Sequence, residues 1–152
     1  MDFIFLIAVF LISVVLHEVS HGAVANALGD STAKDEGRLT LNPIPHLDPF
    51  GSVVLPLLLL LITQGGFAIG WAKPVPVNTH NLRDQKWGGA KVSIAGPASN
   101  LMLALVFGLM LRFLPLAALS QQAGLASVIP HFLASIVSIN LLLALFNLLP
   151  IP

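Results

Sequence analysis

The chain has 152 residues, of which 56% are hydrophobic and only 9% charged, and its formal net charge is zero. A soluble domain carries about a quarter charged residues, so this composition indicates an integral membrane protein that contacts the lipid bilayer. The balanced charge gives no electrostatic basis for binding nucleic acid. The absence of cysteine excludes disulfides, thiolate metal sites and a cysteine nucleophile.

Long apolar stretches recur along the chain and predict helices at about 3–28, 50–69, 91–119 and 130–149. A helix that crosses a bilayer needs roughly 20 apolar residues, and all four stretches are long enough. We therefore expect an all-α membrane protein with a single domain over residues 1–152. Its helices would form a polytopic bundle of about four transmembrane segments, with a short extended segment at the membrane surface.

The first apolar stretch ends in the motif H-E-x-x-H, formed by His17, Glu18 and His21. Residues four apart share one face of a helix, so the two histidines can direct their imidazoles at one metal ion. Glu18 lies about 100° round the helix from His17, close enough to reach a water on that metal. Two imidazoles and a neighbouring carboxylate are the arrangement of a hydrolytic zinc site.

These residues are not expected to occur here by chance. Placing one ionisable side chain in a membrane-spanning helix costs roughly 2.5–3.5 kcal/mol of insertion free energy. A bound metal supplies the partner that offsets this cost. Zinc lowers the pKa of its bound water towards about 7. Glu18 would accept the proton of that water during attack on a peptide carbonyl and pass it to the departing amine.

A secretory signal is the alternative interpretation of the first stretch, because Ala23-Val24-Ala25 resembles a cleavage site. The region before the apolar run carries Asp2 and no basic residue, which argues against a signal.

The segment "NPIPHLDPFGS" that follows contains His46 and Asp48. Its prolines and glycine predict a turn in which Asp48 caps the next helix. Both residues are also alternative metal ligands. The later segment "GWAKPVPVN" at 70–78 predicts an extended edge that could pair with an extended substrate. An interfacial loop with Trp71 at headgroup depth is compatible with the same residues.

Amides are the polar groups of the last two predicted helices. Asn100 follows the small residues of "AGPASN", and Asn140 and Asn147 share one helical face. Buried amides in lipid need partners. We predict Asn140 as a catalytic helper that donates to the carbonyl oxyanion, with joining of helices as the alternative.

Five motifs taken together resemble the site-2 proteases, a family of intramembrane zinc metalloproteases, in their compact bacterial branch. They are H-E-x-x-H at 17–21, "GRLTLNPIPHLDPFGS", "GWAKPVPVN", "AGPASN" and "NLLPIP". The resemblance implies a multi-pass protein of the bacterial or archaeal cell membrane that cleaves transmembrane protein substrates. It implies one Zn²⁺ per chain with His17 and His21 as ligands and Glu18 as acid and base.

The family's third zinc ligand is an aspartate in an L-D-G motif shortly after a stretch like "NLLPIP". The sequence ends at Pro152, before that position. We therefore expect the C-terminal part of the family domain to be missing. A catalytically inactive relative that binds a substrate or partner without cutting is the first alternative. A metal transporter or chaperone is the second, and it would need ionisable residues deep in the later helices.

Basic residues predict the orientation. The loop 70–91 carries four of them and is expected on the cytoplasmic side. With four full spans, the loop 29–49 would lie outside. Pro56 permits a second segment that spans only half of the membrane, which would change this assignment.

Overall fold

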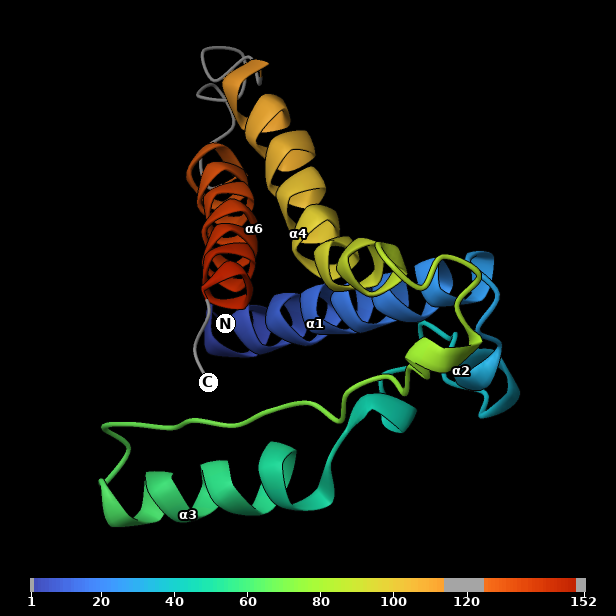
Figure 1. The fold of residues 1–152 in the computed structure, drawn as a ribbon. Helices are drawn as coiled ribbons and strands as arrows, with labels where there is room; N and C mark the ends of the chain where they lie inside the picture. The colour runs from blue at the N-terminus through green and yellow to red at the C-terminus, as the bar shows by residue number, and fades with distance from the viewer. Residues whose placement is uncertain (1, 114–124, 150–152) are drawn as a thin grey trace. The chain divides into compact units, whose positions relative to one another are not determined.

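The computed structural model describes residues 2–113 and 125–149, and this part of the chain is mainly helical (Figure 1). Its α-helices are α1 (Asp2–Ala27), α2 (Thr32–Asp35), α3 (Leu55–Ile62), α4 (Gly88–Phe113) and α6 (Leu125–Leu148). Shorter turns are the 3₁₀ segments η1 (Ile44–His46) and η3 (Thr79–Asn81) and the π-helical segment η2 (Pro49–Val54). Internal contacts divide the chain into unit 1, Met1–His17 with Ser93–Pro152, and unit 2, Glu18–Val92.

Within the described residues, three helices are long and apolar enough to cross a membrane. They cover Ile4–Ala27, Gly88–Phe113 and Val128–Leu148. This confirms the predicted class of an all-α membrane protein. The expected helices at 3–28, 91–119 and 130–149 correspond to α1, α4 and α6, although residues 114–119 lie outside the described part of the chain.

The fourth expected span, at 50–69, is wrong in length. Its α-helix covers only Leu55–Ile62, and with η2 the apolar helical stretch is Pro49–Ile62. Pro56 lies in the first turn of α3, inside the helical stretch Pro49–Ile62, and it offers no amide hydrogen to the preceding turn. The helix ends because Gln64 and Gly65 take positive φ angles of 53° and 86°, which turn the chain back. The kink expected at Pro56 is therefore a junction between η2 and α3.

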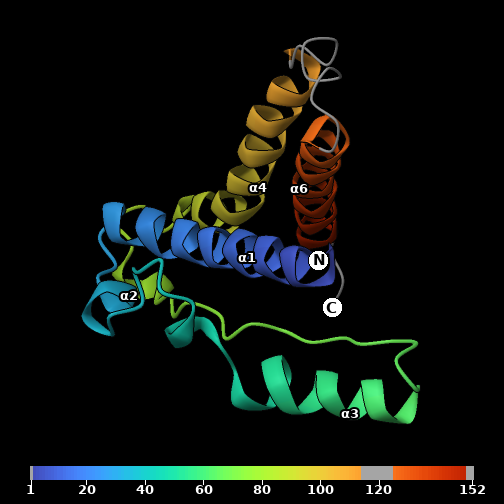
Figure 2. The same ribbon diagram turned by 180° about the vertical axis from the view of Figure 1, so that it is seen from behind.

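Unit 1 contains the first part of α1, most of α4 and α6. The rings of Phe5 on α1 and Phe132 on α6 lie 4.0 Å apart between centroids. The same two helices are joined by a hydrogen bond from Asn140 Nδ2 to Ser13 Oγ, 3.0 Å. Both views show α6 beside the later part of α4 (Figures 1 and 2).

Unit 2 contains the rest of α1, the start of α4 and the chain between them. Its core consists of Ala25, Leu82 and Val92, with Val24, Leu28 and Val77 packed against them. Helix α1 ends where Gly29 takes a φ of +112°, a conformation that glycine adopts at little cost. In the described residues the expected extended segment forms only one isolated antiparallel bridge, between Leu47 and Ala72.

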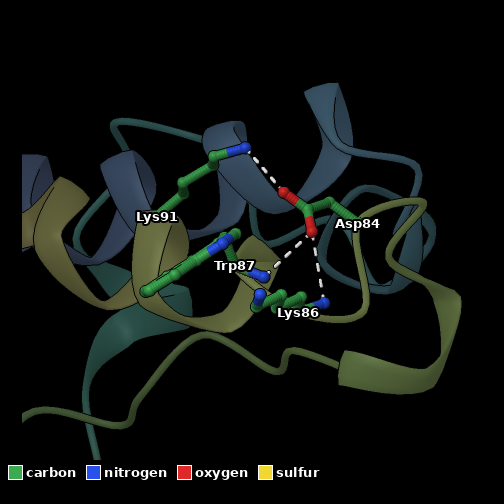
Figure 3. Close-up of polar contacts among 4 residues, drawn as sticks. All are labelled: Asp84, Lys86, Trp87 and Lys91. Atoms are coloured by element: carbon green, nitrogen blue, oxygen red, sulfur yellow. Dashed lines mark hydrogen bonds and ion pairs between the residues drawn. The ribbon is translucent and has the colours of Figure 1, made fainter.

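The turn before helix α4 is organised by Asp84 (Figure 3). One carboxylate oxygen accepts hydrogen bonds from the backbone N–H groups of Lys86 and Trp87. The other accepts from Lys91 Nζ at 2.7 Å. These contacts lower the pKa of the Asp84 carboxyl, with the Lys91 hydrogen bond as the largest cause. A carboxylate at this end also suits the positive end of the helix dipole.

Candidate metal centre

The H-E-x-x-H motif lies within α1, so His17 and His21 are one helical turn apart on the same helix face. The side chain of His17 is buried, with 4% of its surface exposed, and Glu18 and His21 are half-buried. Helix α1 thus carries both histidines, as their spacing predicts. The roles of these residues remain predictions.

His21 is oriented by the start of α4. Its Nδ1 lies 2.7 Å from the carbonyl oxygen of Val92. A carbonyl only accepts hydrogen bonds, so Nδ1 carries the hydrogen. In the neutral ring the lone pair is then on Nε2, the nitrogen that would face a metal. Metal-binding histidines commonly donate their other nitrogen to a carbonyl or carboxylate in this way.

Glu18 contacts the expected extended edge itself, residues 70–78. Its Oε2 accepts a hydrogen bond from the backbone N–H of Val75 at 2.9 Å. Val75 stands between Pro74 and Pro76, so its amide is the only backbone donor between Lys73 and Val77. The one donor that this stretch offers to another strand is therefore already used by Glu18, which weakens the prediction of strand pairing at these residues.

Gly22 allows the same segment to approach α1 closely, one turn after Glu18. A Cβ atom at Gly22 would lie 2.6 Å from Leu39 Cδ2 and 2.8 Å from Val75 Cγ1. Neither distance is tolerated, so only glycine fits here without movement of the neighbours. The contact fixes the distance between Val75 and the helix that carries Glu18.

The residues around Val75 are held in place by three polar groups from earlier in unit 2. Arg38 donates from one guanidinium nitrogen to the carbonyls of Lys73 and Pro74, at 2.9 and 3.2 Å. The Lys73 N–H donates to the His46 carbonyl at 2.9 Å. Asp30 accepts from the N–H of Asn78 at 2.7 Å.

Asp30 is fully buried and collects further donors. The Asn81 amide donates to it at 3.0 Å, and both the backbone N–H and the hydroxyl of Thr32 donate to it as well. Burial raises the pKa of the Asp30 carboxyl, but these hydrogen bonds, led by that of the Thr32 hydroxyl, together lower it below its ordinary value. Asp30 is therefore a charged anchor between the end of α1 and the segment 78–81. Sequence reasoning missed it, and Asp-Ser-Thr after a helix-ending glycine was its only local signal.

His46 and Asp48, the alternative ligands, have structural contacts. Asp48 is the N-cap of η2 and accepts from the Gly51 N–H at 2.6 Å, as the turn interpretation predicts. His46 is buried, and its Nε2 lies 2.9 Å from the Thr40 carbonyl. Among the described residues, no group of three His, Cys, Asp or Glu side chains lies close enough to hold a metal.

The two buried amides of unit 1 differ in their hydrogen bonds. Asn140 Nδ2 donates to Ser13 Oγ and to the Ile136 carbonyl, so both of its hydrogens have acceptors. This favours the helix-joining alternative, while the oxyanion role stays a prediction. Asn100 is equally buried, and its Nδ2 has no partner within the described residues. An amide donor without an acceptor is better suited to receive an oxygen from a substrate.

Comparison with known proteins relates the chain to bacterial proteins of one kind. It is 42% identical over 148 residues to "Putative zinc metalloprotease YwhC" of Bacillus subtilis, covering 97% of this chain and 64% of that protein. It is 38% identical over 151 residues to "Putative zinc metalloprotease Rip2" of Mycolicibacterium smegmatis, covering 99% of this chain and 53% of that protein. The Rip2 protein of Mycobacterium tuberculosis H37Rv is 36% identical, with the same coverage.

The chain spans between about half and two thirds of the length of these curated relatives. No family model and no solved structure matches it. The similarity extends over nearly the whole chain, so it includes both units, and it relates them to proteins named as zinc metalloproteases.

Proposed function

We propose that the chain is an intramembrane zinc metalloendopeptidase of the site-2 protease type, which cleaves transmembrane protein substrates. The observation that carries the proposal is the continuous apolar helix α1, in which His17 and His21 lie one turn apart. The hydrogen bond between His21 Nδ1 and Val92 supports a ligand role for Nε2. The similarity to proteins named as zinc metalloproteases supports the same assignment.

The donor set fits zinc as far as the described residues extend. Two imidazole nitrogens are favourable zinc ligands, and Glu18 follows His17 directly as a carboxylate with no need to bind the metal. Catalytic zinc is usually held by three protein ligands. The described residues supply two, and one zinc per chain is the expected content.

Glu18 carries the proton transfers in the proposed reaction. When bound, zinc would lower the pKa of a water molecule and polarise the substrate carbonyl. Glu18 takes the proton of that water while the water oxygen forms a bond to the carbonyl carbon. The carbon–nitrogen bond then breaks, and Glu18 returns the proton to the departing amine. The second hydrogen of the water stays on the new carboxylic acid and is then transferred to the amine, so the products are a carboxylate and an ammonium group, and Glu18 is regenerated.

The sequence-based prediction of Asn140 as the donor to the carbonyl oxygen is kept as part of the proposal. Asn140 would have to exchange its bond to Ser13 for the substrate. Loss of one such donor typically costs about 10²–10³ in turnover.

The test is zinc content and cleavage measured on the same detergent-purified full chain. Zinc per chain is determined by mass spectrometry, and cleavage is followed on a reporter with one transmembrane segment. We expect near-stoichiometric zinc, lost in His17→Ala and in His21→Ala. Glu18→Gln is expected to keep the zinc and to lose at least about 10² in turnover. The control is Glu36→Gln, an exposed acid in the same unit, which should change neither reading.

Absence of zinc together with absence of cleavage would contradict the proposal. That result would favour the alternative of an inactive membrane relative that binds a substrate without cutting it. Cleavage that survives Glu18→Gln would also overturn the assigned mechanism.

A further inference from the structure

Within unit 2, the uncharged stretch between Asp48 and Lys73 folds back on itself. We call it the apolar hairpin (residues 49–72). It contains no ionisable side chain, and a charged residue stands directly at each end. Its helical leg is η2 with α3, Pro49–Ile62, and its returning leg is extended. Figures 1 and 2 show the returning leg running back along α3.

The two legs are tied together at their base. The Trp71 N–H donates to the Gly51 carbonyl at 3.2 Å, and Ser52 Oγ donates to the Trp71 carbonyl at 2.7 Å. At the tip, the Gly65 N–H donates to the Leu60 carbonyl at 2.8 Å. The Phe67 N–H donates to Thr63 Oγ1 at 3.0 Å. These bonds give partners to backbone groups at the base and the tip, and the helical leg satisfies its own, which lowers the cost of placing these groups in lipid.

The hairpin exposes large apolar side chains on both legs. No residue of α3 is buried, and Leu61 is 78% exposed. The returning leg adds Phe67, Ile69 and Trp71, which are also exposed. Exposing an apolar surface of this kind to water raises the free energy, and contact with hydrocarbon lowers it. The helical leg is roughly 21 Å long at 1.5 Å per residue, which is shorter than the bilayer core of about 30 Å.

The polar segments before and after the hairpin are bonded to each other. The Arg83 N–H donates to the Leu28 carbonyl at 2.9 Å. Asn78 and Asn81 donate to Asp30, and Arg38 donates to the Lys73 carbonyl. If residues 49–72 crossed the membrane, segments 28–48 and 73–87 would lie on opposite sides of it. All of these bonds would then be lost.

We propose that the apolar hairpin enters the hydrocarbon of the membrane and returns to the same face. The partner of its exposed surface is the lipid acyl chains. Segments 28–48 and 73–87 then share one face of the membrane, and the chain has three full spans, α1, α4 and α6. The proposal does not depend on peptidase activity.

The first test uses single-cysteine variants, because the chain has no cysteine of its own. Glu36→Cys, Lys86→Cys and Arg112→Cys place thiols at exposed positions before the hairpin, after it and near the far end of α4. Each variant is treated with a membrane-impermeant maleimide in right-side-out and inside-out vesicles from expressing cells. We expect residues 36 and 86 to react in the same vesicle orientation and residue 112 in the opposite one. Reaction of residues 36 and 86 in opposite orientations would overturn the proposal.

The second test separates insertion into the membrane from a position in water. A polarity-sensitive fluorophore is attached at Leu61→Cys and, as the control, at Glu36→Cys. We expect nitroxide-labelled acyl chains to quench the probe at residue 61 and aqueous iodide to quench the probe at residue 36. Quenching of residue 61 by iodide, with no effect of the labelled lipid, would show that the hairpin is not inserted.

Discussion

The two units hold the same helix by different means. In unit 1, the first part of α1 is held by apolar contacts, one aromatic pair and one amide hydrogen bond. In unit 2, the second part of α1 is held by the hydrogen bonds of Glu18 to Val75 and of His21 to Val92. The segments around it are joined by hydrogen bonds of the buried Asp30 carboxylate and the buried Arg38 guanidinium. The difference indicates that a loop of unit 2 positions Glu18, whereas the start of α4 positions His21.

The largest effect on stability is expected for Asp30→Asn. The substitution keeps the shape of the side chain but removes the charge that accepts from Thr32, Asn78 and Asn81. Hydrogen bonds to a charged group are the strong ones, and we expect a loss of about 3 kcal/mol. The chain's two tryptophans, Trp71 and Trp87, both lie in unit 2, so their fluorescence during unfolding in mixed micelles reports this loss. Asp35→Asn, at an exposed position, is the control.

The same carboxyl predicts the response of unit 2 to acid. The pKa of Asp30 is lowered by folding, so its contribution is present above the ordinary value of 3.8 and is lost as pH falls through the folded value. We expect the difference in unfolding free energy between wild type and Asp30→Asn to shrink as pH falls below about 4. A difference that stays constant down to pH 2 would contradict the assigned charge state.

A smaller effect is expected for Gly22→Ala. Alanine usually stabilises a helix relative to glycine, but here its Cβ would collide with Leu39 and Val75. We expect a net loss of about 2 kcal/mol and lower turnover, because Val75 is displaced from Glu18. Gly89→Ala in α4 is the matched control, since a Cβ there meets no atom within 4 Å. Equal effects of the two substitutions would remove the argument for close packing at Gly22.

The smallest effect is expected in unit 1. Asn140→Ala removes the hydrogen bond to Ser13, and such bonds between membrane helices contribute about 1 kcal/mol or less. Ser13→Ala should have the same effect, and the double variant should add little to either. Loss of helical circular dichroism during unfolding in mixed micelles is the measurement. If Asn140→Ala lowers turnover far more than Ser13→Ala, the amide has a catalytic role as well.

The sequence predicted the elements whose signals are local. The apolar runs of α1, α4 and α6 and the cap at Asp48 follow from composition and short-range pattern. The second predicted span was wrong because an apolar run indicates that a segment prefers lipid, but it does not show whether the chain crosses the membrane or turns back within it. Residues 50–69 are as apolar as a spanning helix, but the turn at Gln64 and Gly65 reverses them.

The polar framework of unit 2 could not be predicted in the same way. Asp30 meets Asn78 across 48 positions in the sequence, and Glu18 meets Val75 across 57. In the sequence Arg38 resembles an ordinary surface residue, but in the structure it is buried and donates to two carbonyls. Such pairs depend on the path of the chain through the apolar hairpin, and a single sequence has no periodicity that records them. By contrast, the placement of His17 and His21 on one helix was predictable, because the two residues are only four positions apart.

The prolines on either side of Val75 bear on whether a peptidase of this kind could cleave its own backbone. A peptidase built around Glu18 would keep a stretch of its own backbone within hydrogen-bonding distance of that carboxylate. Two of the three peptide bonds between Lys73 and Pro76 lead into proline, so their nitrogens are tertiary and lack hydrogen. The carbonyls of Lys73 and Pro74 are held by Arg38, and the remaining nitrogen is bonded to Glu18 itself. In such a peptidase, the stretch beside the carboxylate would resist self-digestion.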